Sequence, residues 1–313
     1  MLLALAVLLC SSSAFCQMNN TSGELNASAL QSLIADASIP SESYRFLMDM
    51  EQNTNIANLT SGEAQELYTH TIGFGSLNMT SRALKLVMAS LTLPRGDDEN
   101  ATASALEEYL LNDTVYLKVD GNWTSMKLPV ISESWSQQNT IGQQIDMLNR
   151  SNLSLLGSEV VDGQECYKLK AEMGSLAIAE QMSQQAASIL PAQSMNLTQL
   201  FRNMSIEALY WITKDAHQLK KAEVLQSFIM NPESLGLPIN ETGNLSMSVN
   251  TTISMVFQDM NKSVNVQLPS EAGNATPFLQ SLLVSGKMDS SALGGNATNV
   301  TMTNNETRTA GLT

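Results

Sequence analysis

Apolar and polar residues alternate along most of this chain, and the alternation is clearest at 114–129. Two such runs flank Asp120-Gly121, a pair that tolerates the positive φ of a tight turn. This arrangement predicts a β-hairpin with one apolar face. The apolar face comprises Val115, Leu117, Val119, Thr124, Met126 and Leu128. The opposite face, which suits water, comprises Tyr116, Lys118, Trp123 and Lys127.

The same period-two pattern predicts further strands on both sides of this hairpin. Asp162-Gly163 marks a second hairpin of the same kind. The other strands are expected at 43–57, 64–71, 82–92, 153–161, 164–172, 206–213, 219–229, 245–258 and 264–268. Because short turns join most neighbouring strands, the pattern predicts an antiparallel meander.

Helical spacing of apolar residues is confined to a few segments. A short helix is expected at 28–37, and shorter helical pieces at 194–203 and 278–284. Only 132–149 and 176–190 are long and amphipathic enough to cover the apolar face of a sheet. We therefore expect an α+β fold, in which a strongly curved antiparallel β-meander carries helices packed on its concave face.

The composition allows a hydrophobic core but leaves a thinly charged surface. Hydrophobic residues make up 43% of the 313 residues, whereas charged residues make up only 15%. The net charge of −14 argues against nucleic acids and anionic membranes as partners, because both are bound by basic surfaces. Something other than charge must therefore keep the surface soluble.

The first residues resemble a secretory signal. An apolar run at 2–9 leads into small residues that end at Cys16, as before a cleavage site near Gln17. The run is too short to cross a bilayer as a helix of the mature protein. We expect a secreted or cell-surface protein, with lipid attachment at Cys16 as the alternative to cleavage alone.

Asn-X-Ser/Thr sequons are the second sign of secretion. The chain holds twenty of them, whereas chance would give roughly five from the abundance of Asn, Ser and Thr. Glycans are bulky and solubilising, so they would compensate for the low charge. The sites that we single out are Asn58, Asn78, Asn100, Asn122, Asn152, Asn203, Asn244, Asn261 and Asn296.

These features divide the chain into four parts. We expect a signal peptide at 1–16, a polar glycosylated segment at 17–27, one folded domain at 28–270, and a disordered Asn/Thr/Ser-rich tail at 271–313. Cys166 is then the one cysteine of the mature chain. Its position in a strand pattern favours a packed residue over a reactive thiol.

Four stretches follow one another in a recognisable order: 115–129, 155–170, 210–224 and 255–269. In this order they resemble the LolA/LppX-like superfamily of lipoprotein carriers and lipid-binding proteins, over about 30–270. The resemblance implies a prokaryotic cell-surface protein, with an archaeal source left open. Its fold would be an incomplete β-barrel that wraps around helices and encloses a hydrophobic cavity. It also implies binding of lipids or lipoproteins without catalysis.

The sequence offers little for catalysis or metal binding. His70 and His217 are the two histidines, whereas a zinc site needs three or four ligands. The acidic run at 97–99 lacks the alternating oxygen ligands of a calcium loop. Gly73-Phe74-Gly75 is a Gly-x-Gly without a helix after it, which is weak evidence for a phosphate loop. We expect no enzyme, no cofactor and no metal.

Methionine is the positive signal for ligand binding. The chain holds 18 of these flexible, polarizable residues, which can line a site that accepts varied apolar chains. With the resemblance, we expect a lipid or acyl chain to bind between sheet and helices, in a carrier or sensor. The alternative is a structural or interaction module of the cell envelope, with a packed core, no ligand, and envelope proteins as partners. The expected cavity residues are Phe46, Met48, Met88, Leu117, Met126, Trp135, Trp211, Met255 and Phe257.

Overall fold

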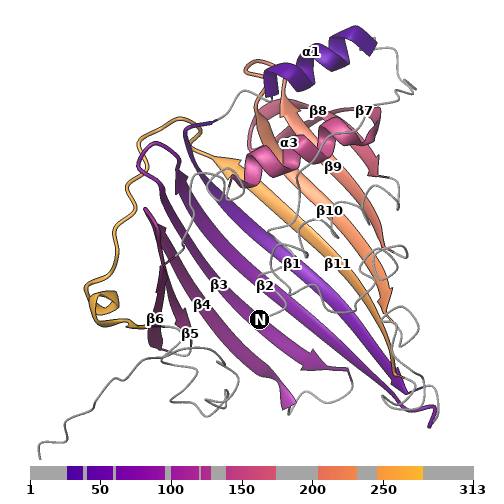
Figure 1. Cartoon of the computed structure of the whole chain (residues 1–313). Coiled ribbons are helices and arrows are strands. Elements are labelled where there is room, and N and C mark those ends of the chain that lie inside the picture. The colour runs from indigo at the N-terminus through magenta and orange to yellow at the C-terminus, as the bar shows by residue number, and fades with distance from the viewer. Residues whose placement is uncertain are drawn as a thin grey trace, which may run out of the picture.

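A single open sheet of twelve strands forms the body of the protein (Figure 1). The computed structural model describes residues 27–37, 41–58, 61–95, 100–119, 121–127, 139–173, 204–230 and 245–277. The strands are β1 (Ser43–Asn58), β2 (Ala64–Asn78), β3 (Ala83–Pro94), β4 (Thr102–Leu111), β5 (Thr114–Val119), β6 (Asn122–Lys127), β7 (Asn152–Val161), β8 (Gln164–Met173), β9 (Ser205–Thr213), β10 (Leu219–Met230), β11 (Leu245–Gln258) and β12 (Thr276–Pro277). The helices are α1 (Ala27–Ala37), α3 (Thr140–Arg150) and a short 3-10 helix, η2 (Ser270–Asn274).

Two antiparallel meanders make up the sheet. The strand order is β12-β6-β5-β4-β3-β2-β1-β11-β10-β9-β8-β7, so the first meander, β1–β6, meets the second, β7–β11, where β1 pairs with β11. All neighbours are antiparallel except the short parallel pair of β12 and β6. A curved antiparallel sheet is confirmed, but the described chain is mostly β rather than α+β. Figure 1 shows α1 and α3 gathered at one end of the sheet.

Both predicted hairpins are present. Val115 pairs with Met126 and Leu117 with Thr124, as a two-residue turn at 120–121 requires. Gly121 has a φ of 83°. In the second hairpin, Asp162 and Gly163 both have positive φ, 47° and 77°, which is the conformation of a tight hairpin turn.

The prediction of a strand at 264–268 is wrong. These residues belong to no strand, because β11 lies inside the sheet and both of its edges are already paired, with β1 and β10. The chain instead turns at Asp259 and Asn261, whose φ values are 53° and 56°. It then packs beside the start of β1, where the backbone N–H of Asn261 donates to the carbonyl of Ser43.

Several other predicted elements lie outside the described residues. These are the helices at 176–190, 194–203 and 278–284, the signal segment 1–16, and most of the tail. The helix expected at 132–149 is described from Thr140. Its N-cap is Asn139, whose Oδ1 accepts a hydrogen bond from the N–H of Gly142 at 3.1 Å, and residues 132–138 are not described. Within the expected tail, η2 and β12 are ordered, and β12 joins the sheet edge.

The two faces of the sheet differ sharply. We call the face that carries Phe46 and Met48 the core face, and the opposite one the outer face. Side chains of the core face form one buried cluster with Leu33 of α1 and Ile145 of α3. Helix α3 packs against β8, and α1 packs against α3, so these helices cover one end of the core face.

Tyr44 of β1 joins the sheet to the start of α3. Its hydroxyl donates to Oδ1 of Asn139 at 3.2 Å and accepts from the N–H of Ile141 at 3.3 Å. The side chain is fully buried, and burial raises the pKa of Tyr44 to about 12. One hydroxyl therefore satisfies a free N–H of the helix N-terminus and also positions its cap.

Tyr44→Phe is expected to lower the free energy of unfolding by about 1–2 kcal/mol, since the N–H of Ile141 loses its buried acceptor. Urea denaturation followed by circular dichroism measures this. Tyr116→Phe is the matched control, because Tyr116 lies half-buried on the outer face, away from the helices. Equal midpoints for the two variants would contradict the role given to Tyr44.

Candidate functional site

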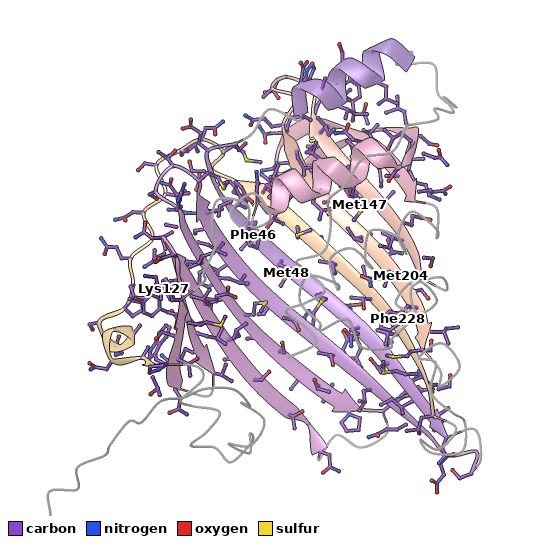
Figure 2. All side chains as sticks on the ribbon, viewed as in Figure 1. Phe46, Met48, Lys127, Met147, Met204 and Phe228 are labelled. Carbon is purple, nitrogen blue, oxygen red and sulfur yellow. The ribbon has the colours of Figure 1, made fainter. Side chains whose placement is uncertain are left out.

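Two adjacent cross-strand rows on the core face bring most of the predicted cavity residues together. The first row contains Met255, Met48, Gly73 and Met88, which face one another across β11, β1, β2 and β3. The second row contains Phe257, Phe46, Gly75, Leu86, Glu108 and Leu117, across β11 and β1 to β5. Figure 2 shows Met48 on the open sheet below α3. Six of the nine predicted residues thus lie in two neighbouring rows of one face, which is apolar except at Glu108.

Two glycines of β2 allow the large side chains of β1 to lie across that strand. A Cβ at Gly75 would be 2.1 Å from Cζ of Phe46, so the ring occupies the space of the missing side chain. A Cβ at Gly73 would be 3.1 Å from Cγ of Met88 and 3.2 Å from Cε of Met48. The Gly-x-Gly therefore has a packing role. The space left by the missing side chains of Gly73 and Gly75 is occupied by the side chains of Met48, Met88 and Phe46.

The apolar surface is bounded at both ends. At one end, α3 places Ile145 and Leu148 in the buried cluster. At the other end, the core face carries polar residues. Thr71 faces Ser90 there, and their hydroxyl oxygens are joined by a 2.7 Å hydrogen bond. The apolar area is therefore a patch with defined limits.

Three predicted residues stand apart from these rows. Met126 lies on the core face, on the edge hairpin, and is 43% exposed. Trp211 is buried on the outer face, where Lys168 and Lys221 lie over its ring, at 4.9 and 4.4 Å from the centroid. The structure therefore does not bring Trp211 to the others. Trp135 lies outside the described residues.

Glu108 is the residue of this surface that the sequence reasoning missed. It faces the core between Leu86 and Leu117 in the second row, and burial raises the pKa of its carboxyl above the usual range. The sequence contains a sign of this: Glu108 alternates with Leu106 and Leu110, so a charged residue occupies the side of the strand that is otherwise apolar.

The outer face carries an unexpected apolar hollow over β1–β4. One part, about 430 Å³, is lined by exposed Leu47, Ile72 and Phe74. An adjoining part of about 580 Å³ continues over Leu91 and Ala103. These side chains lie on the face opposite Phe46 and Met48, so the alternation of apolar and polar residues on these strands is less strict than on the hairpin β5–β6.

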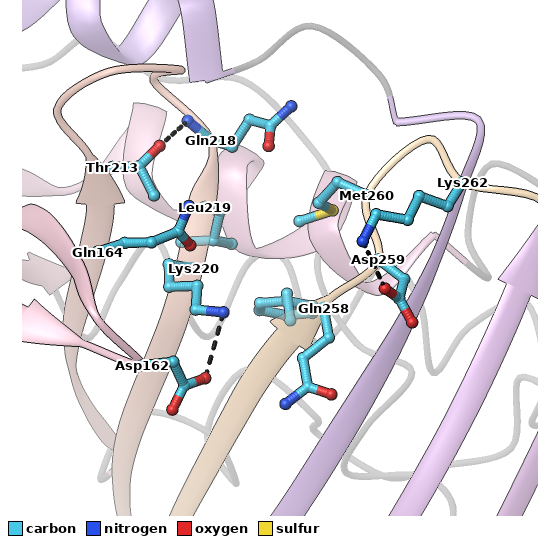
Figure 3. A pocket seen from close by; sticks show the side chains of 11 residues that line it. Asp162, Gln164, Thr213, Gln218, Leu219, Lys220, Gln258, Asp259, Met260 and Lys262 are labelled. Atoms are coloured by element: carbon cyan, nitrogen blue, oxygen red, sulfur yellow. Dashed lines mark hydrogen bonds and ion pairs between the residues drawn. The ribbon is translucent and has the colours of Figure 1, made fainter.

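A polar pocket of about 450 Å³ lies at the end of the sheet beside α3 (Figure 3). Its charged groups pair with each other: Lys220 with Asp162 at 3.2 Å, and Lys262 with Asp259 at 2.9 Å. Lys262, helped by Arg45, lowers the pKa of the Asp259 carboxyl. Because these charges already neutralise one another, the pocket offers no group prepared for proton transfer.

Other candidate chemistry is equally sparse in the described chain. No group of three or more His, Cys, Asp or Glu side chains within it is placed to hold a metal ion. Cys166 is buried, and burial raises the pKa of its thiol, as expected for a packed cysteine. Of the helices that the structure describes, none has the length and apolar character needed to span a bilayer.

The sequons occupy different environments. Asn100, Asn122, Asn152 and Asn261 are exposed, and Asn58 and Asn78 are half-buried. Nδ2 of Asn78, the atom that would carry a glycan, donates to the carbonyl of Val264 at 3.0 Å. Asn203, Asn244 and Asn296 lie outside the described residues.

Several solved structures are similar to this chain. The solved structures that match include lipoprotein LppX from Mycobacterium tuberculosis, with 17% identity and a TM-score of 0.35 over 76% of this chain and 99% of LppX. LprF from Mycobacterium bovis matches with 13% identity and a TM-score of 0.39 over 76% and 96% of the two chains. A LolA superfamily protein from Nitrosomonas europaea matches with 11% identity and a TM-score of 0.19 over 77% and 95%.

The first and third matches bear names that belong to the superfamily that the sequence resembles. The curated proteins contain no match to this sequence. Residues 26–277 match the profile of a family described as a family of unknown function, DUF6612. Since this match spans most of the chain, the protein belongs to the DUF6612 family.

Proposed function

We propose that this protein binds a hydrophobic ligand, a lipid or acyl chain, against the core face of its sheet, as a carrier or sensor without catalysis. The row of Met255, Met48 and Met88 across Gly73 carries the proposal. Methionine side chains can repack around apolar chains of different shape, and a glycine between them leaves room for this movement. The half-buried neighbours Leu86 and Leu117 extend the same surface.

The proposed location is outside the cell or on its surface, after removal of the signal at 1–16. Glycans on the exposed sequons Asn100, Asn122, Asn152 and Asn261 would then supply the solubility that the low charge does not. Lipid attachment at Cys16 is the alternative, and in that case cleavage falls before Cys16 so that this residue stays on the mature chain. A lipid or acylated ligand and other cell-envelope proteins are the proposed partners.

A second function, a structural or interaction module without a ligand, has one specific observation in its favour. Phe46 and Met48 are only 5% and 4% exposed, as in a closed core. The two functions differ in whether an apolar molecule can enter beside these side chains, so binding of a small neutral probe distinguishes them.

Fluorescence of 1-N-phenylnaphthylamine, a neutral probe, is expected to rise on mixing with the delipidated full-length protein, and a long-chain lipid should displace it. Met88→Gln should weaken probe binding about tenfold, because a polar end replaces an apolar one in the site. Leu47→Gln is the control, because Leu47 lies on the outer face of β1.

If Leu47→Gln weakened probe binding and Met88→Gln did not, the probe would bind in the outer hollow, and the proposal would be overturned. Absence of any probe binding by the wild-type protein would favour the packed structural module.

A further inference from the structure

Glu108 is the one charged side chain on the core face of β11 and β1–β6, within the part of the chain that the structure describes. Leu106 and Leu110 precede and follow it on the same face of β4. Leu86 and Leu117 face it from β3 and β5. A carboxyl group thus lies at the centre of four leucine side chains, at the border of the proposed ligand surface.

Neighbouring charges do not neutralise this carboxyl group. Glu108 makes no hydrogen bond or ion pair with the residues that the structure describes, and desolvation is the one influence that shifts its pKa. The preceding residue, Glu107, lies on the outer face and has partners there. Its carboxylate accepts a 2.8 Å hydrogen bond from the Tyr109 hydroxyl and lies 3.9 Å from Nζ of Lys118.

An unpaired carboxylate in apolar surroundings is costly, and a positively charged partner removes much of that cost. A ligand that brings a cation to this position is therefore bound by both its chain and its head. We propose that Glu108 binds the ammonium head of the hydrophobic ligand, which makes the preferred ligand class an amphiphile with one apolar chain and a cationic amine. This inference rests on the proposed function, because the chain of the ligand must occupy the core face.

The same geometry disfavours fatty acids. A ligand carboxylate placed beside Glu108 would put two negative charges together, and the described core face of β11 and β1–β6 has no cation to separate them. A long-chain alcohol should bind with an affinity between those of the amine and the fatty acid, because its hydroxyl can donate to Glu108 without carrying charge. The structure thus predicts an order of affinity set by the head at constant chain length.

Displacement of 1-N-phenylnaphthylamine from the delipidated full-length protein by dodecylamine, dodecan-1-ol and dodecanoate tests this order. In the wild type, dodecylamine should bind at least tenfold more tightly than dodecan-1-ol, and dodecanoate most weakly. Glu108→Gln should remove the preference of amine over alcohol. Glu107→Gln removes the same charge from the same strand, so it controls for general attraction of amines to a protein of net charge −14.

Retention of the amine preference in Glu108→Gln, or equal loss in both variants, would overturn the role of Glu108. In either case the proposed function survives if all three compounds displace the probe. If none of them displaces the probe and the probe itself does not bind, the proposed function fails and this inference fails with it.

Discussion

Gly75→Ala is expected to lower the free energy of unfolding by about 2–3 kcal/mol, the upper range for overpacking a core. The new Cβ would lie 2.1 Å from Cζ of Phe46, so the ring must move. Phe46 has little room to do so, because its ring packs 6.2 Å from that of Tyr44, which in turn meets Phe257 at 5.9 Å. Movement of one ring therefore disturbs the whole buried aromatic group.

Gly73→Ala is the matched control, two residues earlier on the same face. A Cβ at Gly73 would be 3.1 Å from Cγ of Met88, 3.2 Å from Cε of Met48 and 3.2 Å from the backbone carbonyl oxygen of Val87. The two methionine side chains are flexible and can shift at low cost. The expected loss is below about 1 kcal/mol. Urea denaturation measures both variants, and Phe46→Leu combined with Gly75→Ala should recover part of the stability. Equal losses at the two glycines would contradict the close packing described for Phe46.

Glu108→Gln is expected to stabilise the protein at neutral pH by about 1 kcal/mol, since an unpaired charge no longer has to be buried. Burial raises the pKa of the Glu108 carboxyl in the folded state above its unfolded value. Below the unfolded pKa both states are protonated, and the wild type carries no penalty from ionisation. As the pH rises through the folded pKa, the wild type loses that stability and the variant does not.

The difference in unfolding free energy between Glu108→Gln and wild type should therefore be small near pH 4 and reach a plateau above the folded pKa. Urea titrations from pH 4 to pH 8 give this profile. Glu107→Gln should show no such gain, because the Glu107 carboxylate is paired with Lys118 and hydrogen-bonded to Tyr109. A pH-independent difference for Glu108→Gln would mean that its carboxyl is not desolvated in the folded protein.

Local sequence patterns were sufficient for the hairpins and for the core face of the central strands. The positive-φ turn residues Gly121, Asp162 and Gly163 set the registers. Strict alternation in β1 and β11 placed Phe46 and Met255 on one face. The alternation of β9 was not sufficient. Tyr210 and Trp211 are neighbours, so both faces of that strand carry an aromatic residue, and the pattern gave no reason to choose between them.

The features that sequence reasoning missed depend on strands distant in the chain. Trp211 is buried on the outer face because Lys168 of β8 and Lys221 of β10 cover it. The strand expected at 264–268 does not form because β1, some two hundred residues earlier, already occupies the edge of β11. Glu108 has a special environment only because β3 and β5 place leucines beside it. Each of these facts requires the sheet order, which no short pattern contains.

The pairing of β1 with β11 also governs how the chain can be made. During synthesis, β1 emerges early and can pair with β2, but its other edge stays open until β11 has been made. An open edge of this kind is a template for association with other chains, and contacts so distant in sequence form slowly. The nascent protein therefore passes through a period in which its first meander is folded on one side only, with Phe46 and Met48 exposed to any apolar molecule nearby. Under the proposed function, loading of the ligand and completion of the sheet would be one event.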